Sequence, residues 1–182
     1  MKIAIFGLAR SGLAALKVLA QEAQHEIFLI SAGEPSSWTN FDIVTNYVTL
    51  DHCFDQKDAA ILFTKMDEII LSPGIARDHQ VLQSALNIGV PVISEIEFAY
   101  RRCNVPVVGI TGTNGKTTTT TMIGKLLEMA GLNVFVGGNI GIPYSEILLS
   151  SQKFDVAVIE LSSFQLESIT SFHPHIALLL NI

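Results

Sequence analysis

The residues best suited to chemistry form a glycine-rich loop at positions 111–118. Successive backbone N–H groups in such a loop make a nest for anions, and a helix that begins directly after it turns its positive end toward phosphate. In this pattern Lys116 reaches the β- and γ-phosphates of a nucleoside triphosphate, and the Thr117 hydroxyl binds Mg²⁺. The spacing departs from a strict P-loop, because Ile110 stands where the motif has its first glycine. We predict ATP binding by Gly112, Thr113, Asn114, Gly115, Lys116, Thr117 and Thr118.

A carboxylate ends the run Asp155–Glu160, where a buried parallel strand is expected. Glu160 at such a strand tip, beside a phosphate loop, is placed to bind the second side of the Mg²⁺. The polar stretch after it favours a binding site over a solvated strand end, and we predict that Ser162 contacts substrate. Lys116 and Glu160 are therefore the predicted catalytic residues, and Thr117 and Glu160 are the predicted metal ligands.

A second glycine-rich turn, Gly137–Gly141, follows another strand pattern. Glycines let a ligand approach the backbone closely, and the Asn139 side chain can both donate and accept hydrogen bonds. We predict that Asn139 contacts substrate, while an ordinary turn with glycines at positive φ is the competing interpretation.

The segment Gly7–Gly12 has the G-x-A-x-x-G form of a dinucleotide-binding turn. A nicotinamide site would add an acidic residue at the tip of the next strand to bind the ribose, but Ser31–Gly33 stands there. A NAD-dependent dehydrogenase is therefore the last of the alternatives. The turn can still hold a diphosphate, with further contacts from Ser72, Pro73 and Gly74, although these three residues also fit a plain turn.

These motifs lie between strand and helix patterns that alternate along the chain. The strand patterns are short and apolar on consecutive positions, as in parallel strands covered on both faces. We predict strands at Lys2–Phe6, Glu26–Ile30, Glu68–Leu71, Val90–Ser94, Val105–Thr111, Asn133–Val136, Val156–Glu160 and Ile176–Asn181. We predict helices at Ser11–Ala23, His79–Leu86, Glu95–Arg102 and Thr117–Ala130. The alternation predicts a doubly wound α/β fold whose ligands bind beyond the carboxyl ends of parallel strands.

A domain boundary is expected near Arg101–Pro106, just before a new strand and the phosphate loop. Two consecutive α/β domains, 1–104 and 105–182, would then carry one nucleotide-type site each. The sequence ends at Ile182, directly after a predicted strand and before the loop that would complete a site. We therefore expect these residues to be a fragment of a longer chain.

Composition narrows the range of partners. Of the 182 residues 49% are hydrophobic and 15% charged, which indicates heavily buried elements. A net charge of −6 argues against a sequence-independent nucleic-acid binder, which needs Lys and Arg to neutralise phosphates.

The longest charge-free stretch, 129–145, is broken by glycines and Pro143, so no membrane insertion is expected. Cys53 and Cys103 lie far apart and predict neither a metal site nor a disulfide, which favours the cytoplasm.

Three segments together resemble the Mur ligase family: Gly112–Thr117, Gly138–Gly141 and Glu160–Leu166. The segments Gly7–Leu13 and Ser72–Ala76 fit the same family, so the resemblance covers the whole chain in order. The phosphate loop is shared by all Mur ligases and by folylpolyglutamate synthases. The stretch that follows Glu160 favours the members that add D-glutamate.

The resemblance implies a Rossmann-like domain for a UDP-sugar, followed by the first part of a P-loop ATPase domain. It implies an ATP-dependent amide ligase of peptidoglycan synthesis, in which ATP phosphorylates the carboxylate of UDP-N-acetylmuramoyl-L-alanine and the amine of D-glutamate attacks the acyl phosphate. The implied cofactors are ATP and Mg²⁺. The family's uracil site would fall at Arg10, Ser11 and Ser31–Gly33, where the acidic residue usual in relatives is missing.

The family's third domain, and a histidine and a carbamylated lysine that serve its magnesium, are expected beyond Ile182. The 182 residues alone are therefore expected to lack ligase activity. The alternatives are another Mur-type or folylpolyglutamate-type ligase, a P-loop NTPase of another kind, and a non-catalytic nucleotide-sugar-binding module. A stand-alone NTPase would not need the first domain.

Overall fold

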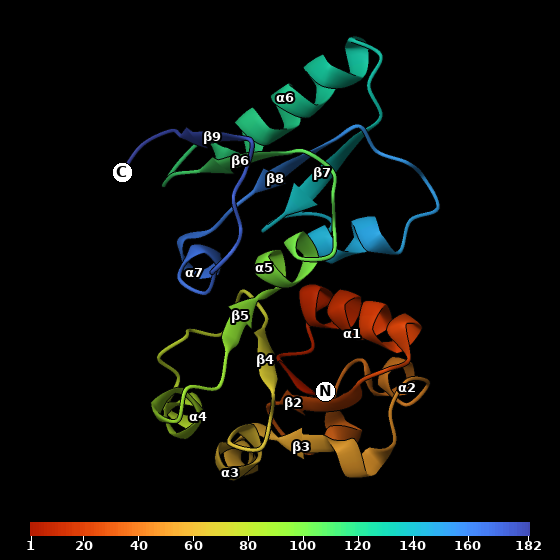
Figure 1. The fold of residues 1–182 in the computed structure, drawn as a ribbon, viewed down its shortest axis with the longest axis vertical. Coiled ribbons are helices and arrows are strands. Elements are labelled where there is room, and N and C mark those ends of the chain that lie inside the picture. The colour runs from red at the N-terminus through yellow and green to blue at the C-terminus, as the bar shows by residue number, and fades with distance from the viewer. The chain divides into compact units, whose positions relative to one another are not determined.

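The chain consists of two compact α/β units, described for all residues from Met1 to Ile182 by a computed structural model (Figure 1). The units are Met1–Glu95 and Ile96–Ile182, and each contains its own parallel sheet. The predicted α/β class is confirmed. The division falls before residue 104 because helix α5 (Glu95–Tyr100) packs Ile96 and Ala99 into the core of the second unit. The functional assignment of 1–104 and 105–182 stays a prediction.

The first unit is built on a five-stranded sheet of order β3-β2-β1-β4-β5, in which every pairing is parallel. Its strands are β1 (Lys2–Phe6), β2 (Glu26–Ser31), β3 (Cys53–Asp55), β4 (Glu68–Leu71) and β5 (Val92–Ser94). Helix α1 (Arg10–Glu22) lies over one face, while α3 (Ala59–Phe63) and α4 (Gln83–Asn87) pack against the other (Figure 1). The strands are apolar on consecutive positions because both of their faces are covered.

Short elements complete the first unit between these strands. Helix α2 spans Phe41–Val44. Four 3-10 helices lie in the connections between strands: η1 (Pro35–Ser37), η2 (Leu50–His52), η3 (Gln56–Asp58) and η4 (Gln80–Leu82).

The second unit is a four-stranded parallel sheet of order β7-β8-β6-β9. Its strands are β6 (Val107–Thr111), β7 (Val134–Gly138), β8 (Val156–Glu160) and β9 (Ile176–Leu179). Helix α6 (Lys116–Met129) covers one face, on which Val108, Ile110 and Val158 are buried. The other face, with Ala157 and Ile159, packs against α5, η5 (Tyr144–Leu148) and α7 (Ser163–Leu166) (Figure 1).

In each sheet the first strand lies in the interior, and later strands are added on both of its sides. In the first sheet β1 lies between β2 and β4, and in the second sheet β6 lies between β8 and β9. Open α/β sheets bind ligands at such a switch point, in the crevice outside the carboxyl ends of the strands. The loops after β1 and β6 are the glycine-rich segments 7–12 and 111–118, so the topology gives each of them the position expected of a ligand-binding loop.

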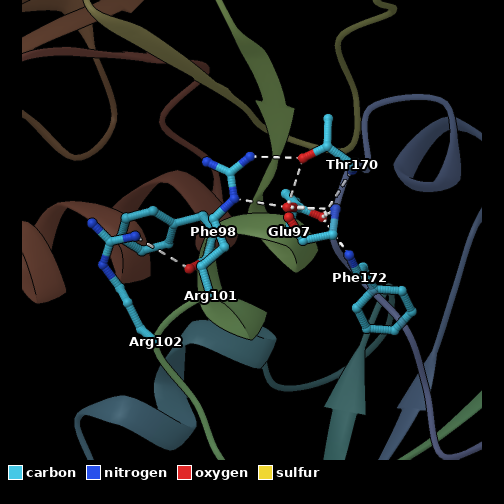
Figure 2. A network of polar contacts seen from close by, with 7 residues as sticks. Glu97, Phe98, Arg101, Arg102, Thr170 and Phe172 are labelled. Carbon is cyan, nitrogen blue, oxygen red and sulfur yellow. Dashed lines mark hydrogen bonds and ion pairs between the residues drawn. The ribbon is translucent and has the colours of Figure 1, made fainter.

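A buried carboxylate anchors the segment that leads into β9 (Figure 2). Glu97 on α5 is fully buried and accepts hydrogen bonds from the backbone N–H groups of Thr170, Ser171 and Phe172, from the Thr170 hydroxyl and from Arg101. Burial by itself would raise the pKa of Glu97, but the hydrogen bonds from Thr170, Arg101 and Phe172 outweigh it and lower the pKa to about 2. The carboxylate is therefore charged at neutral pH, and it fixes the start of the last strand.

None of the helices is both long enough and apolar enough to cross a bilayer.

Candidate functional site

The phosphate loop joins the end of β6 to the start of α6, as the sequence predicts. It turns through two glycines at positive φ, Gly112 at +138° and Gly115 at +81°, where other residues would be strained. Gly115 is also the N-cap of α6, so the helix starts at Lys116. The N–H groups of the first helical turn have no partners within the helix and lie beside the loop, which is the arrangement that binds phosphate.

The ammonium group of Lys116 lies on the inner side of this loop. Its Nζ donates to the carbonyl oxygen of Gly112 at 2.5 Å and to that of Thr113 at 3.1 Å. The positive charge is thereby held beside the loop backbone.

The structure brings three predicted residues together at the tip of β8. The Thr117 hydroxyl donates to Oε2 of Glu160 at 2.9 Å, and Nδ2 of Asn139 donates to Oε1 at 3.2 Å. The backbone N–H of Asn139 also donates to the Glu160 carbonyl at 2.9 Å. Gly138 makes this approach possible, because a Cβ at that position would lie 2.2 Å from the carbonyl oxygen of Glu160.

The surroundings of Glu160 fit a divalent cation. Its side chain is 1% exposed and accepts hydrogen bonds from two neutral groups, while no lysine or arginine pairs with it. A buried carboxylate without a cation is unfavourable. Carboxylate and hydroxyl oxygens are the ligands that Mg²⁺ prefers, and Mg²⁺ usually takes its remaining ligands from water and phosphate. No group of three His, Cys, Asp or Glu side chains that could hold a metal ion is found in the chain.

Ser162 lies beside this cluster in sequence, but its hydroxyl serves the start of α7. It accepts from the Gln165 N–H at 3.2 Å, and Oε1 of Gln165 accepts from the Ser162 N–H at 2.9 Å. This reciprocal pair is a capping box, which the Ser-x-x-Gln spacing could have predicted. The predicted substrate contact by Ser162 stays a prediction.

In the first unit, the predicted residues after β1 and β4 meet at the switch point. The Ser72 hydroxyl donates to the Gly7 carbonyl at 2.7 Å, which joins the two turns. A Cβ at Gly12 would lie 2.0 Å from the same carbonyl oxygen, so α1 can start this close only with glycine there. Pro73 and Gly74 continue the turn after β4, and Arg10 and Ser11 form the first turn of α1.

A cavity of about 320 Å³ opens next to this turn, at the ends of β1 and β2. It is lined by Leu8, Ala9, Ser31, Ala32, Ser37, Trp38, Thr39 and Asn40. Sequence reasoning missed the last four residues. Nε1 of Trp38 donates to the Gly33 carbonyl at 3.0 Å, and Nδ2 of Asn40 donates to the Leu8 carbonyl at 2.9 Å. The first bond closes the loop after β2 on itself, and the second joins this loop to the first glycine-rich turn.

Comparison with known proteins matches both units to one family. The family model "Mur ligase MurD-like, N-terminal domain" matches residues 1–94, and "Mur ligase middle domain" matches residues 110–182. The UDP-N-acetylmuramoylalanine--D-glutamate ligase of Trichlorobacter lovleyi is 41% identical over 186 residues, which is 100% of this chain and 40% of that protein. The enzyme of the same name from Geobacter metallireducens is 40% identical over 180 residues, covering 99% of this chain and 39% of its own length. The chain thus spans about 40% of the length of these curated relatives.

A solved structure supports the fold. The UDP-N-acetylmuramate:L-alanyl-gamma-D-glutamyl-meso-diaminopimelate ligase of Neisseria meningitides aligns with a TM-score of 0.56 at 24% identity, over 99% of this chain and 60% of that one. The parallel sheets, the phosphate loop at the switch point of the second sheet and the two matching family models lead to one conclusion. The chain belongs to the Mur ligase family, with a MurD-like N-terminal domain followed by a Mur ligase middle domain.

Proposed function

We propose that this chain provides the UDP-sugar site and the phosphate-binding part of the ATP site of an ATP-dependent ligase. The ligase joins D-glutamate to UDP-N-acetylmuramoyl-L-alanine in peptidoglycan synthesis. The observation that carries the proposal is the contact of Thr117 with the buried Glu160, 2.9 Å apart beside the loop that holds Lys116. The D-glutamate-adding specificity is supported by the two relatives at about 40% identity over nearly the whole chain.

In the proposed reaction the γ-phosphoryl group of ATP is transferred to the carboxylate of UDP-N-acetylmuramoyl-L-alanine. The amine of D-glutamate attacks the resulting acyl phosphate, phosphate leaves and an amide forms. Phosphoryl transfer needs alignment and charge neutralisation more than covalent help from the protein. The N–H groups at the start of α6 hold the phosphates, and the Lys116 ammonium moves from the loop carbonyls to a phosphate oxygen.

The metal of the proposed site is Mg²⁺, held by the Thr117 hydroxyl and the Glu160 carboxylate, with Asn139 orienting the carboxylate. When bound, Mg²⁺ neutralises the charge on the β- and γ-phosphates. Asn139 is thereby proposed to act through Glu160, and the contact with substrate predicted for it stays a prediction.

The UDP part of the substrate is assigned to the first unit. The diphosphate is proposed to lie at the switch point, against the turns that carry Arg10, Ser11 and Ser72–Gly74. The base is proposed to enter the cavity that Trp38 lines. The cytoplasm is the proposed location, and the free thiols of Cys53 and Cys103 agree with a reducing compartment.

The test is a chimera in which residues 1–182 replace the matching segment of the Trichlorobacter lovleyi ligase. Phosphate release from ATP is measured with UDP-N-acetylmuramoyl-L-alanine, with and without D-glutamate. We expect D-glutamate-dependent release by the chimera and none by the 182 residues alone. A chimera that unfolds at the temperature of its parent enzyme but releases no phosphate would overturn the proposed function. Ligation by the 182 residues alone would overturn the proposal that they are insufficient.

A further inference from the structure

The side chain of Asn181, two residues after the end of β9, forms hydrogen bonds with the phosphate loop. Its Oδ1 accepts from the backbone N–H groups of Thr113 at 2.8 Å and Asn114 at 2.9 Å. Its Nδ2 donates to the Asn114 carbonyl at 3.1 Å. One carboxamide thus holds three polar groups of two consecutive loop residues, although it lies 67 positions away from Asn114 along the chain.

The topology of the second sheet puts Asn181 in this place. Strand β9 pairs with β6 so that Leu179 is opposite Thr111, and the Leu180 N–H donates to the Thr111 carbonyl at 3.0 Å. Asn181 therefore leaves the sheet beside the first residues of the loop. The absence of a side chain at Gly112 allows this approach, because a Cβ there would lie 3.1 Å from the backbone nitrogen of Asn181.

The bonds of Asn181 divide the loop into a held part and an open part. Asn181 accepts hydrogen bonds from the N–H groups of Thr113 and Asn114. Lys116 donates hydrogen bonds to the carbonyls of Gly112 and Thr113. The N–H groups of the first turn of α6 are left without helical partners and remain available to an anion. The first half of the loop is therefore held by hydrogen bonds within the protein, whereas the N–H groups that follow it are available to an anion.

We propose that Asn181 is a positioning residue of the nucleotide site. It clamps residues 113–114 so that the loop is already shaped for phosphate before the nucleotide arrives. The inference rests on the proposed function, since it takes the ligand of the loop to be ATP. Preorganisation of this kind lowers the conformational entropy that binding has to overcome, so the clamp raises nucleotide affinity.

The opposite role makes the opposite prediction. If the Asn181 oxygen were a stand-in for a phosphate oxygen, the nucleotide would have to displace it, and removing it would leave affinity unchanged or increase it. The sign of the change in affinity therefore separates a clamp from a stand-in.

The experiment compares the wild-type chain with Asn181→Ala, with Asn181→Asp and with the control Asn133→Ala. Asn133 is an exposed asparagine that precedes β7, and its hydrogen bond to Asp155 comes from its backbone N–H, which alanine keeps. Affinity for ATP with Mg²⁺ is measured by calorimetry, and hydrogen exchange of the Thr113 and Asn114 amides is followed by NMR without nucleotide.

We expect Asn181→Ala to weaken ATP binding by about tenfold and to speed exchange at both amides, because two acceptor contacts are lost. Asn181→Asp keeps an acceptor oxygen and should retain slow exchange, and Asn133→Ala should match the wild type in both measurements. If the wild type binds ATP and Asn181→Ala binds it equally well or more tightly, the positioning role of Asn181 is overturned, while the proposed function stands. A wild-type chain that does not bind ATP would overturn the proposed function, and the clamp's role in nucleotide binding with it.

Discussion

Lys116 lies on the phosphate loop and Glu160 at the neighbouring tip of β8, and the two side chains have different surroundings. The Lys116 ammonium is bonded to loop carbonyls at the protein surface, whereas the Glu160 carboxylate is buried among neutral donors. A charged side chain that has few stabilising partners in the free protein, and that a ligand would contact, is typical of a binding site. These two side chains therefore offer the most informative substitutions.

Removal of the Lys116 ammonium should weaken binding of ATP at least about tenfold, because a charge-assisted contact to phosphate is lost. The free energy of unfolding should change by no more than about 0.5 kcal/mol, as for a surface substitution. Calorimetry and thermal unfolding of Lys116→Ala test both statements. Lys125→Ala, on the exposed side of the same helix, is the matched control. Normal ATP affinity in Lys116→Ala would remove Lys116 from the site.

Glu160→Gln keeps the shape of the side chain and removes the buried charge. Without ligand, the variant should be as stable as the wild type or about 1 kcal/mol more stable, because an uncompensated buried carboxylate is lost. The increase in ATP affinity caused by Mg²⁺ should shrink, since a metal ligand has gone. Chemical denaturation and ATP titrations with and without Mg²⁺ measure the two effects, with the exposed Glu128→Gln as control. An unchanged Mg²⁺ effect would contradict the assignment of Glu160 as a ligand.

Several of these residues could be predicted from sequence, and others could not, for a physical reason. The loop residues and Thr117 form a local motif, and a strand tip next to a phosphate loop predicted Glu160. The contact of Asn139 with Glu160 and that of Asn181 with the loop depend on strand order, which no local pattern contains. The Ser162 hydroxyl caps α7, as the Ser-x-x-Gln spacing predicts, and its contact with substrate stays a prediction.

At the scale of elements, the long and strongly apolar patterns were predicted well and the short ones were missed. All eight predicted strands are present, with ends that shift by a few residues. Strand β3 was missed because it has only three residues at the sheet edge and includes Asp55, which breaks an apolar pattern. Helix α7 has four residues, too few for a hydrophobic period to be visible. The loop of residues 37–40 has no regular pattern either, and its place beside the first glycine-rich turn depends on the hydrogen bond from Asn40 to the carbonyl of Leu8, 32 positions away.

The anchor of β9 gives a prediction about stability. Glu97→Gln replaces one acceptor oxygen with an NH₂ group that faces backbone N–H donors, and it removes the charge that Arg101 contacts. We expect a loss of about 3 kcal/mol in the free energy of unfolding, typical of breaking a buried charged network. Urea denaturation measures this loss. A loss below about 0.5 kcal/mol, the size of a surface effect, would show that the anchor is dispensable.

The same carboxylate makes a prediction about pH. Because the pKa of Glu97 is lowered from 4.5 to about 2, its charged form stabilises the fold above pH 4.5, and this contribution is lost as the pH falls toward 2. The shift corresponds to about 3 kcal/mol. The difference in stability between the wild type and Glu97→Gln should therefore shrink between pH 5 and pH 2. A difference that stays constant over this range would contradict the lowered pKa.

At the scale of the whole molecule, the two units repeat one arrangement. Each has a parallel sheet, a switch point beside its first strand and a glycine-rich turn at that point. The fold class followed from the alternation of strands and helices. The compact units divide at residue 95, because α5 packs into the second core, and the assignment of 1–104 and 105–182 to two functional domains stays a prediction. Two sites in separate units should respond to separate ligands.

Trp38 gives a simple test of this separation, because it is the single tryptophan of the chain and lines the cavity of the first unit. Titration with UDP should change its fluorescence, since the base would enter beside the ring. Titration with ATP and Mg²⁺ should leave the emission unchanged, because the phosphate loop belongs to the second unit. A response to ATP at the same concentration as to UDP would mean that the cavity does not discriminate the two nucleotides.

The most direct test of the central claim is an amide NMR spectrum of the 182-residue chain during titration with ATP and Mg²⁺. The claim is that the loop after β6 and the tip of β8 form one nucleotide site. It predicts that the largest shifts fall on residues 112–118 and on Asn139 and Glu160, while the first unit is little affected. Saturable binding with its largest shifts outside these residues, or no shifts at millimolar ATP, would contradict it.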